Sequence, residues 1–333
     1  TVVMGFDYAN AKLDDRVGNA ASYTGGLVGT VNLYDPDFSG FPKLRPGPLL
    51  KYSLWQVGTY AEDMLRYRHW VLTVGARQDW TNTTVRAPVG KTTVTQGGDA
   101  DQFTWRAGLA YEFANGIVPY ASYTTSFEPA LGINAQGHPF KPTQGKQAEA
   151  GIRYQPAGYQ AYFTLAAYNL RETNVATTDP ANPVLSVQTG EIRSRGIEAE
   201  AHANLSDNLR LIASYNHINQ RITADTNFRG KRPTITPRDT ASIWLDYTFS
   251  GGLLRDLGFG AGVRYAGTSE GDQANSFEVP ALTLMDVSAH YDWQRWRLAL
   301  NVSNLFNREY VSYCSTAAVC YWGATRSVLA TAR

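Results

Sequence analysis

Hydrophobic and polar residues alternate along most of this sequence. Between Arg297 and Ser303, for example, Leu298, Leu300 and Val302 fall on one face, and polar or small residues fall on the other. A period of two residues is that of a β-strand with one apolar and one polar face. The same period predicts an all-β fold of about fourteen strands. The predicted strands are Val2–Leu13, Ser53–Arg66, Trp70–Thr81, Phe103–Phe113, Val118–Phe127, Gln147–Tyr154, Tyr159–Thr173, Ile197–Leu205, Leu209–Asn219, Ala241–Phe249, Phe259–Tyr265, Thr283–Tyr291, Arg297–Ser303 and a closing strand before Arg333.

The connections between these strands alternate in length. Short turns, such as residues 114–116 and 206–208, alternate with connections of roughly ten to thirty-five residues, as in a barrel whose turns and loops lie on opposite sides of a membrane. Aromatic residues such as Trp70 and Trp80 gather at strand ends, where a membrane barrel has its interfacial girdles. A soluble β-sandwich requires neither feature. Residues 1–333 are therefore predicted to be one domain, a transmembrane antiparallel β-barrel.

The two faces of the predicted strands differ in charge as well as in hydropathy. The apolar face should meet lipid, and we expect Phe103, Leu109, Val263 and Leu300 on this outer belt. Burying many unpaired charges in a protein core would cost several kcal/mol each. The other face must therefore line water or a second polar surface, such as a plug. Its charged residues are Arg77, Arg106, Glu112, Glu149, Arg153, Glu198, Glu200, Asp246, Arg264 and Asp286.

Overall composition excludes two other classes of protein. The formal net charge is +1 and the pI is near 7.7, which gives no basic excess for a nucleic-acid partner. No segment approaches the ~20 consecutive apolar residues of a membrane-spanning helix. The first residues, TVVMGFDYAN, contain neither a charged region nor an apolar core of a targeting segment. They read as the inside of a strand, so we expect a fragment of a longer barrel.

Candidate catalytic and metal-binding motifs are few. Glu198-x-Glu200-x-His202 places three potential metal ligands on one strand face, although any polar strand face does this by alternation. Gly258-x-Gly260-x-Gly262 lies outside a βαβ unit, so small residues on an inward strand face explain it better than a nucleotide site. The histidines are scattered and no hydrolase or nucleotide-binding signature occurs. We therefore predict no enzyme activity, no resident metal and no cofactor.

The chain contains two cysteines, Cys314 and Cys320, six residues apart in one predicted loop. A disulfide between them would place this loop in an oxidising compartment. Two free thiols or a metal-binding pair are the alternatives, and no neighbouring histidine or second cysteine pair would complete a metal site. The disulfide is the prediction.

Several segments of the chain carry a family resemblance: residues 302–311 (VSNLFNREYV), 321–330 (YWGATRSVLA), 119–129 (PYASYTTSFEP), 145–150 (GKQAEA) and 190–200 (GEIRSRGIEAE). The resemblance covers essentially the whole chain and is to TonB-dependent siderophore receptors, and among them to the ferrichrome (ferric hydroxamate) type. The run NLFNREY is typical of most such receptors, whereas the cysteine loop followed by Trp322-Gly323-Ala324 is similar to ferrichrome-type members. Ser315 departs from the aromatic residue expected after the first cysteine in that type.

The resemblance implies an outer-membrane barrel of a Gram-negative bacterium with twenty-two strands, of which this chain supplies the last fourteen, and with an N-terminal plug that lies outside it. Such receptors take up ferric siderophores with energy from the TonB-ExbB-ExbD complex, and the iron travels within the siderophore. Outer-membrane lipid or lipopolysaccharide would surround the barrel, and phages or bacteriocins are further possible partners. The siderophore-binding candidates implied by position are Tyr23, Phe127, Tyr313, Tyr321 and Trp322, each of which could instead be an interface or loop-packing aromatic.

Two other functions fit a membrane barrel. A passive porin should have a constriction loop with clustered charges, and the sequence shows no such loop. An outer-membrane hydrolase should have a nucleophile and a base on adjacent strand tops near the rim. Binding and import of a ferric siderophore, without covalent chemistry, is the function that the sequence favours.

Overall fold

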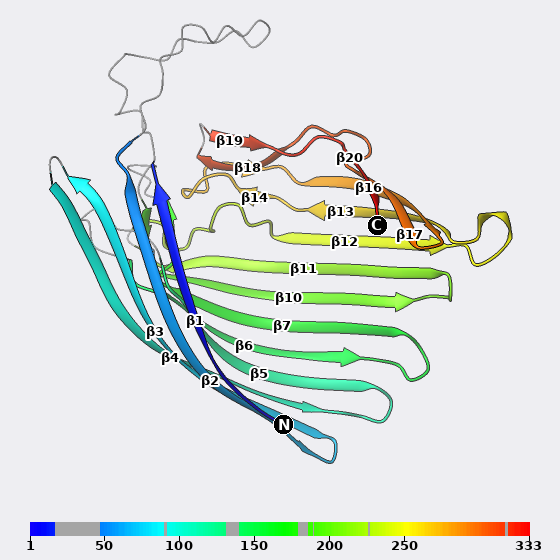
Figure 1. Cartoon of the computed structure of the whole chain (residues 1–333), viewed down its shortest axis with the longest axis horizontal. Helices are drawn as coiled ribbons and strands as arrows, with labels where there is room; N and C mark the ends of the chain where they lie inside the picture. Colours follow the sequence, from blue (N-terminus) through cyan, green and yellow to red (C-terminus); the bar gives the residue numbers. More distant parts are fainter. Residues whose placement is uncertain are drawn as a thin grey trace, which may run out of the picture.

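Fourteen antiparallel strands form one curved sheet in the computed structural model (Figure 1). The structure describes residues 1–16, 47–89, 92–130, 140–178, 186–188, 190–225, 227–316 and 319–333. Each strand of the sheet pairs with the next one in chain order, and β1 and β20 are its edges. The prediction of an all-β fold with about fourteen strands is confirmed. The strands are β1 Val2–Asp15, β2 Leu50–Tyr67, β3 Trp70–Val89, β4 Thr92–Tyr111, β5 Ile117–Glu128, β6 Thr143–Tyr154, β7 Ala161–Thr173, β10 Glu191–Asn204, β11 Leu209–Ala224, β12 Asp239–Thr248, β13 Leu257–Ala266, β16 Leu282–Trp293, β17 Trp296–Ser303 and β20 Ser327–Ala332.

The two ends of the sheet differ as the connection lengths predicted. At one end, called the turn end below, the connections are residues 68–69, 112–116, 155–160, 205–208, 249–256 and 294–295. The longer connections lie at the opposite end, called the loop end (Figure 1). Three small hairpins belong to these longer connections: β8 Ala176–Thr178 with β9 Ser186–Gln188, β14 Ser269–Glu270 with β15 Glu278–Val279, and β18 Val311–Thr316 with β19 Val319–Trp322.

One connection differs from its prediction. The strand expected to end at Thr81 continues to Val89, and its partner β4 begins at Thr92, so β3 and β4 form a long hairpin. The physical reason is the β-branched residues at 83–85 and 92–95, which favour extended backbone. Thr81, Thr83 and Val85 continue the alternation and are buried.

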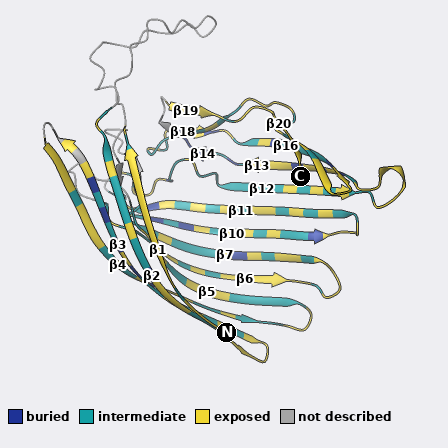
Figure 2. Ribbon diagram, in the orientation of Figure 1, coloured by how far each residue is buried: buried dark blue, intermediate teal, exposed yellow. Residues whose placement is uncertain are grey.

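Apolar side chains lie on one face of the sheet, called the outer face, and remain accessible. Phe103, Leu109, Val263 and Leu300 are 55%, 45%, 37% and 44% exposed. Figure 2 shows exposed and half-buried positions along most strands. The expected outer belt is therefore present, and a common buried interior for these four residues would have contradicted it. In the described part of the chain, no helix is long and apolar enough to cross a membrane.

Two of the arginines predicted for the other, inner face, Arg77 and Arg106, pair with nearby carboxylates. Arg77 contacts Asp7 and Asp79 at 2.6 Å each, and Arg106 contacts Glu62. These pairs span β1, β2, β3 and β4. Partnered charges of this kind lower the cost of placing so much charge on one wall.

The glycines of the Gly258-x-Gly260-x-Gly262 run also lie on the inner face. A side chain at Gly258 would collide with the His290 ring, and one at Gly260 or Gly262 would collide with Trp244. The run therefore provides room for rings from the neighbouring strands, which confirms the expectation of small residues on an inward face.

Candidate ligand-binding site at the loop end

An aromatic group at the loop end belongs to the β18–β19 hairpin. Tyr313 lies opposite Tyr321, and their rings stack with centroids 4.6 Å apart and planes 20° apart. Cys314 and Cys320, the next pair toward the tip of the hairpin, form the predicted disulfide. The adjacent Trp322 is 74% exposed. The hairpin therefore presents rigid aromatic surface, because the covalent link and the ring stack fix both strands.

A buried asparagine anchors the base of this hairpin. Asn304 is 3% exposed; its Oδ1 accepts from the Arg308 amide at 2.8 Å, and its Nδ2 donates to the carbonyls of Arg308 and Ala324 at 2.9 and 3.1 Å. The Oδ1 of Asn307 accepts from the Arg326 amide at 2.8 Å. Both asparagines have left-handed backbones, with φ of 53° and 50°. Asparagine tolerates this conformation, which explains its two places in the NLFN run.

An ion pair on the inner face connects this base to the sheet. Arg264 donates two hydrogen bonds to Asp286, at 2.5 and 3.0 Å, and the same carboxylate accepts from the Asn304 amide at 2.8 Å. The Leu305 amide also donates to the Met285 carbonyl at 2.8 Å. The hairpin base is thus tied directly to β13 and β16.

The structure groups three of the five predicted ligand-binding residues. Tyr313, Tyr321 and Trp322 lie together on the β18–β19 hairpin. Phe127 is half-buried one residue before the end of β5, and in the described part of the chain no ring contact joins it to the hairpin. Tyr23 lies outside the described residues.

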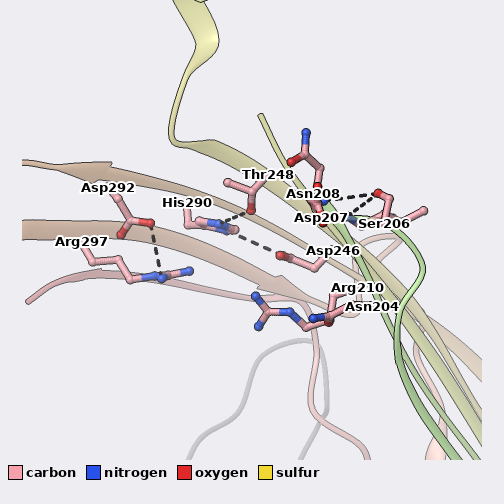
Figure 3. Close-up of a pocket in the computed structure, with 11 residues that line it drawn as sticks. Asn204, Ser206, Asp207, Asn208, Arg210, Asp246, Thr248, His290, Asp292 and Arg297 are labelled. Carbon is pink, nitrogen blue, oxygen red and sulfur yellow. Dashed lines mark hydrogen bonds and ion pairs between the residues drawn. The ribbon is translucent and has the colours of Figure 1, made fainter. Parts of the chain in front are cut away.

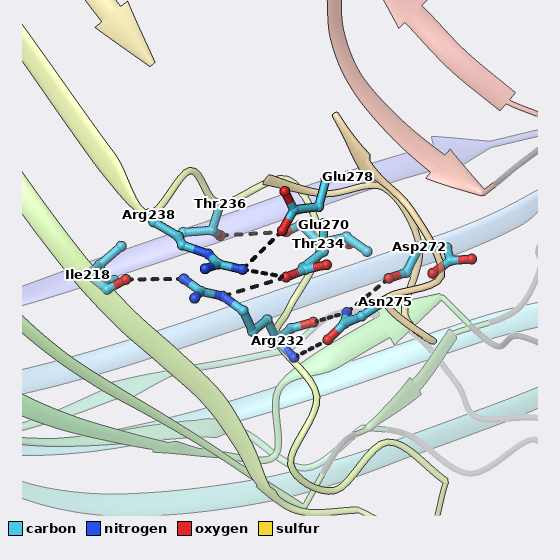
Figure 4. A network of polar contacts seen from close by, with 9 residues as sticks. All are labelled: Ile218, Arg232, Thr234, Thr236, Arg238, Glu270, Asp272, Asn275 and Glu278. Atoms are coloured by element: carbon cyan, nitrogen blue, oxygen red, sulfur yellow. Dashed lines mark hydrogen bonds and ion pairs between the residues drawn. The ribbon is translucent and has the colours of Figure 1, made fainter. Parts of the chain in front are cut away.

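A second polar group at the loop end was not predicted from the sequence. Figure 4 shows Glu270 between Arg232 and Arg238, which come from the connection between β11 and β12. The Glu270 carboxylate lies 3.8 Å from Arg232 and 3.4 Å from Arg238, and Arg238 also contacts Glu278 at 3.0 Å. We call these four residues the closed cluster. The two arginines and the two glutamates lie in separate connections, so no local pattern in the sequence predicts their contact.

Burial makes the pairing of charges in the closed cluster energetically important. The side chains of Arg232 and Glu270 are 8% and 7% exposed. Burial lowers the pKa of Arg232, Arg238 and Arg221 lower it further, and Glu270 opposes this shift. The backbone of Arg232 is also fixed, because its amide donates to Asn275 Oδ1 at 2.8 Å and its carbonyl accepts from Asn275 Nδ2 at 2.9 Å. The cluster therefore fastens two connections together.

At the turn end, a polar cavity of about 280 Å³ contains a histidine between a carboxylate and a hydroxyl (Figure 3). His290 Nε2 lies 3.3 Å from Thr248 Oγ1, and His290 Nδ1 lies 3.7 Å from Asp246 Oδ2. The second distance is too long for a hydrogen bond. A hydrolase site would be expected near the loop rim, whereas this cavity lies at the opposite end of the sheet, and packing on Gly258 holds the ring.

The metal-site alternative on β10 does not form a cluster. The His202 ring stacks on Tyr162 with centroids 4.6 Å apart. Among the residues that the structure describes, no group of three or more metal-ligating side chains converges.

Comparisons with known proteins agree with this architecture. Residues 2–305 match the family model described as TonB dependent receptor-like, beta-barrel. The chain is 39% identical to the ferrichrome outer membrane transporter/phage receptor of Escherichia coli K12, covering 100% of this chain and 45% of that protein. It is 34% identical to the ferrioxamine B receptor of Salmonella typhimurium, covering 98% of this chain and 46% of that protein.

Solved structures show the same fold. The ferric-catecholate import receptor Fiu of E. coli superposes with a TM-score of 0.78 at 22% identity, over 99% of this chain and 51% of that chain. This chain spans about half the length of the curated relatives that it matches. Members of this family are receptors of the Gram-negative outer membrane and not enzymes. The chain therefore belongs to the TonB-dependent receptor family, within its β-barrel part.

Proposed function

We propose that this protein imports ferric siderophores of the hydroxamate class across the outer membrane, driven by the TonB-ExbB-ExbD complex. Relatives that match nearly all of the chain are named as ferrichrome and ferrioxamine B receptors. The observation that carries the proposal is the aromatic β18–β19 hairpin, braced by the disulfide and by Asn304 at the loop end. Tyr313, Tyr321 and Trp322 are the proposed contacts, with Phe127 and Tyr23 as further candidates.

The hairpin suits such a cargo chemically. In a ferric hydroxamate the chelator already surrounds the iron, so the protein needs no metal ligands and contacts the organic surface. Aromatic rings supply apolar contact area, while tyrosine hydroxyls and the Trp322 indole N–H can hydrogen-bond to ligand oxygens. Rigid aromatic groups bind with little loss of conformational entropy.

Transport after binding requires the plug and TonB, which the family resemblance implies. In this proposal the plug contacts the inner face, where paired charges such as Arg77 with Asp7 and Arg264 with Asp286 offer polar contacts. Polar contacts can be broken and remade as the plug moves. Phages or bacteriocins would meet the same loop end, and the E. coli relative is itself named a phage receptor.

Growth of a receptor-deficient strain tests the proposed function. The full-length gene is expressed on iron-limited medium with ferrichrome, ferrioxamine B or a ferric catecholate as the iron source. We expect growth on at least one hydroxamate, and none in a host that lacks TonB. Growth on a catecholate alone would correct the ligand class. Growth that does not need TonB would indicate a passive channel, and failure on every siderophore would refute import.

The aromatic contact is tested by Trp322→Ala. Removing the indole should weaken binding of the accepted ferric hydroxamate about tenfold, or about 1.4 kcal/mol. Ligand affinity is measured by quenching of the receptor's intrinsic fluorescence. Phe306→Ala is the matched control, because Phe306 is 75% exposed in the same connection but lies outside the hairpin. Equal affinities for the two variants would remove Trp322 from the site.

A further inference from the structure

The carboxylate of Asp286 accepts hydrogen bonds at the point where β17 ends. Regular pairing of β16 with β17 stops at Val287 opposite Val302, one residue before Asp286 on β16. The Asn304 amide, the first after β17, then donates to Asp286 Oδ1 at 2.8 Å. Asn304 is 3% exposed, so this amide needs a partner inside the protein. The Asp286 side chain therefore continues the role of the β16 backbone where the chain leaves the sheet.

Arg264 fixes the direction of this carboxylate. It donates through Nε to Oδ2 at 2.5 Å and through a terminal nitrogen to Oδ1 at 3.0 Å. The Asp286 side chain is 15% exposed, whereas that of Arg264 is 52% exposed. A paired, charge-assisted contact of this kind has a defined geometry, so the carboxylate can accept from Asn304 in one orientation.

Asn304 in turn contacts both legs of the β18–β19 hairpin. Its Nδ2 donates to the carbonyl of Arg308, which precedes β18, and to the carbonyl of Ala324, which follows β19, at 2.9 and 3.1 Å. One side chain thus sets the spacing of the two legs at their base. The contacts from Arg264 through Asp286 and Asn304 form a continuous connection from β13 to the hairpin.

The exposed indole of the hairpin begins one residue beyond this base. Gly323 separates Ala324 from Trp322, and the Gly323 amide donates to the Tyr310 carbonyl at 2.8 Å. A side chain at Gly323 would collide with the Tyr310 ring, so the legs approach closely here. Trp322 is 74% exposed, and its direction therefore depends mainly on the backbone that Ala324 and Gly323 hold.

We propose that Asp286 is a positioning residue of the ligand site. Acting through Asn304, it sets the direction in which the hairpin aromatics meet the ferric hydroxamate, and so the preference among hydroxamates of different shape. This inference rests on the proposed function. The disulfide and the Tyr313–Tyr321 stack make the hairpin one rigid piece, so a shift at its base would tilt the aromatic surface as a whole. A rigid surface held in one direction discriminates between shapes better than a loose one.

Other ion pairs of the inner face lack this connection. Arg77 and Arg106 contact Asp7 of β1 and Glu62 of β2. Among the described residues, neither of these carboxylates accepts a hydrogen bond from a loop-end connection. They join strands to strands, whereas Asp286 joins the sheet to the hairpin that carries the proposed ligand contacts.

The experiment measures ligand binding to the purified full-length receptor by titration calorimetry, which yields both the affinity and the fraction of receptor that binds. The ligands are ferrichrome and ferrioxamine B, and the variants are Asp286→Ala and Asp286→Asn. We expect Asp286→Ala to bind the preferred ligand about fivefold more weakly and to bring the two affinities closer, with the binding fraction unchanged. Asp286→Asn should recover most of the affinity, because its amide oxygen can still accept from the Asn304 amide. A lower binding fraction with unchanged affinity would indicate a role in folding alone and would overturn the proposal.

A double-mutant cycle shows whether Asp286 acts through the hairpin. Asp286→Ala combined with Trp322→Ala should weaken binding by less than the product of the two single losses, because removal of the indole leaves less to position. Independent losses would overturn the proposal. If Asp286→Ala does not fold, Arg264→Gln, which leaves the carboxylate without its orienting partner, replaces it in the cycle.

Glu112→Ala is the matched control. Glu112 also accepts two hydrogen bonds from an arginine, Arg66, at 2.9 Å each, but at the turn end. Its loss should leave both affinities unchanged, and a loss equal to that of Asp286→Ala would overturn the proposal. If the unmodified receptor binds neither ligand, the proposed function fails, and hydrogen exchange then tests the positioning by itself. Residues 311–322 should exchange faster in Asp286→Ala than in Glu112→Ala, and equal exchange would overturn the role of Asp286.

Discussion

The closed cluster contrasts with a row of basic residues on the outer face, called the basic row: Lys146 of β6, Arg171 of β7, Arg193 of β10 and Arg221 of β11, each opposite the next. The two groups use arginine in opposite ways. In the closed cluster, Glu270 and Glu278 lie against Arg232 and Arg238, and the central pair is almost fully buried. In the basic row, exposed or half-buried cations face one another, and no ion pair with a carboxylate is found for them among the described residues. A buried arginine must find its counter-charge within the protein, because water cannot solvate it. Cations on an accessible face are solvated by water, so they do not need a counter-charge from the protein.

The largest expected effect comes from opening the closed cluster. Glu270→Gln leaves Arg232 buried without its main counter-charge, which should cost about 3–5 kcal/mol of local stability. Limited proteolysis and hydrogen exchange of the connections at 225–238 and 267–281 measure this loss.

Two variants check that charge burial is the cause. Glu278→Gln removes a half-exposed carboxylate, so its effect should be about 0–1 kcal/mol. Arg232→Gln added to Glu270→Gln should restore part of the stability, because no buried charge remains. If the double variant is less stable than the single one, the closed cluster does not depend on charge pairing.

The second expected effect comes from the β18–β19 hairpin, whose two strands are held together by a disulfide and not by an ion pair. Replacing Cys314 and Cys320 by alanine frees the β18–β19 hairpin, and the loop-closure term for so short a loop is about 2 kcal/mol. Hydrogen exchange should rise in residues 311–322, and affinity for the ferric siderophore should fall with it. Exchange in the closed cluster should not change. Unchanged exchange in the hairpin would show that the Tyr313–Tyr321 stack and Asn304 suffice.

The smallest expected effect comes from closing the basic row. Arg171→Glu places a carboxylate between Lys146 and Arg193, and each new opposite-charge pair should add about 0.2–1 kcal/mol to sheet stability in detergent. Thermal unfolding at low salt measures this effect, with Arg295→Glu at the turn end as the control. A lower melting temperature for Arg171→Glu than for the control would mean that the row is not a repulsive group.

Much of the fold follows from the sequence because a membrane barrel repeats one local rule. Alternation identified the strands and placed Phe103, Leu109, Val263 and Leu300 on the outer face. The cysteine spacing identified the disulfide. The extension of β3 and β4 lies beyond the predicted strands, although the β-branched residues at 83–85 favour extended backbone by their own propensity.

The candidate site was only partly predictable. Tyr313, Tyr321 and Trp322 are neighbours in the sequence, so their gathering on one hairpin could be expected. The stack of Tyr313 on Tyr321 and the role of Asn304 at the hairpin base depend on pairing between β18 and β19 and on contacts with Ala324 and Arg308.

What the sequence by itself determined is the sidedness of each strand, because the direction of a side chain in a strand depends only on whether its position is odd or even. What only the tertiary structure decided is which side chains on one face become neighbours. The register that sets Arg171 beside Arg193, and the fold that brings Glu270 against Arg232, join residues distant in the chain. Such contacts depend on the relative placement of whole strands and loops, which no local pattern in the sequence determines.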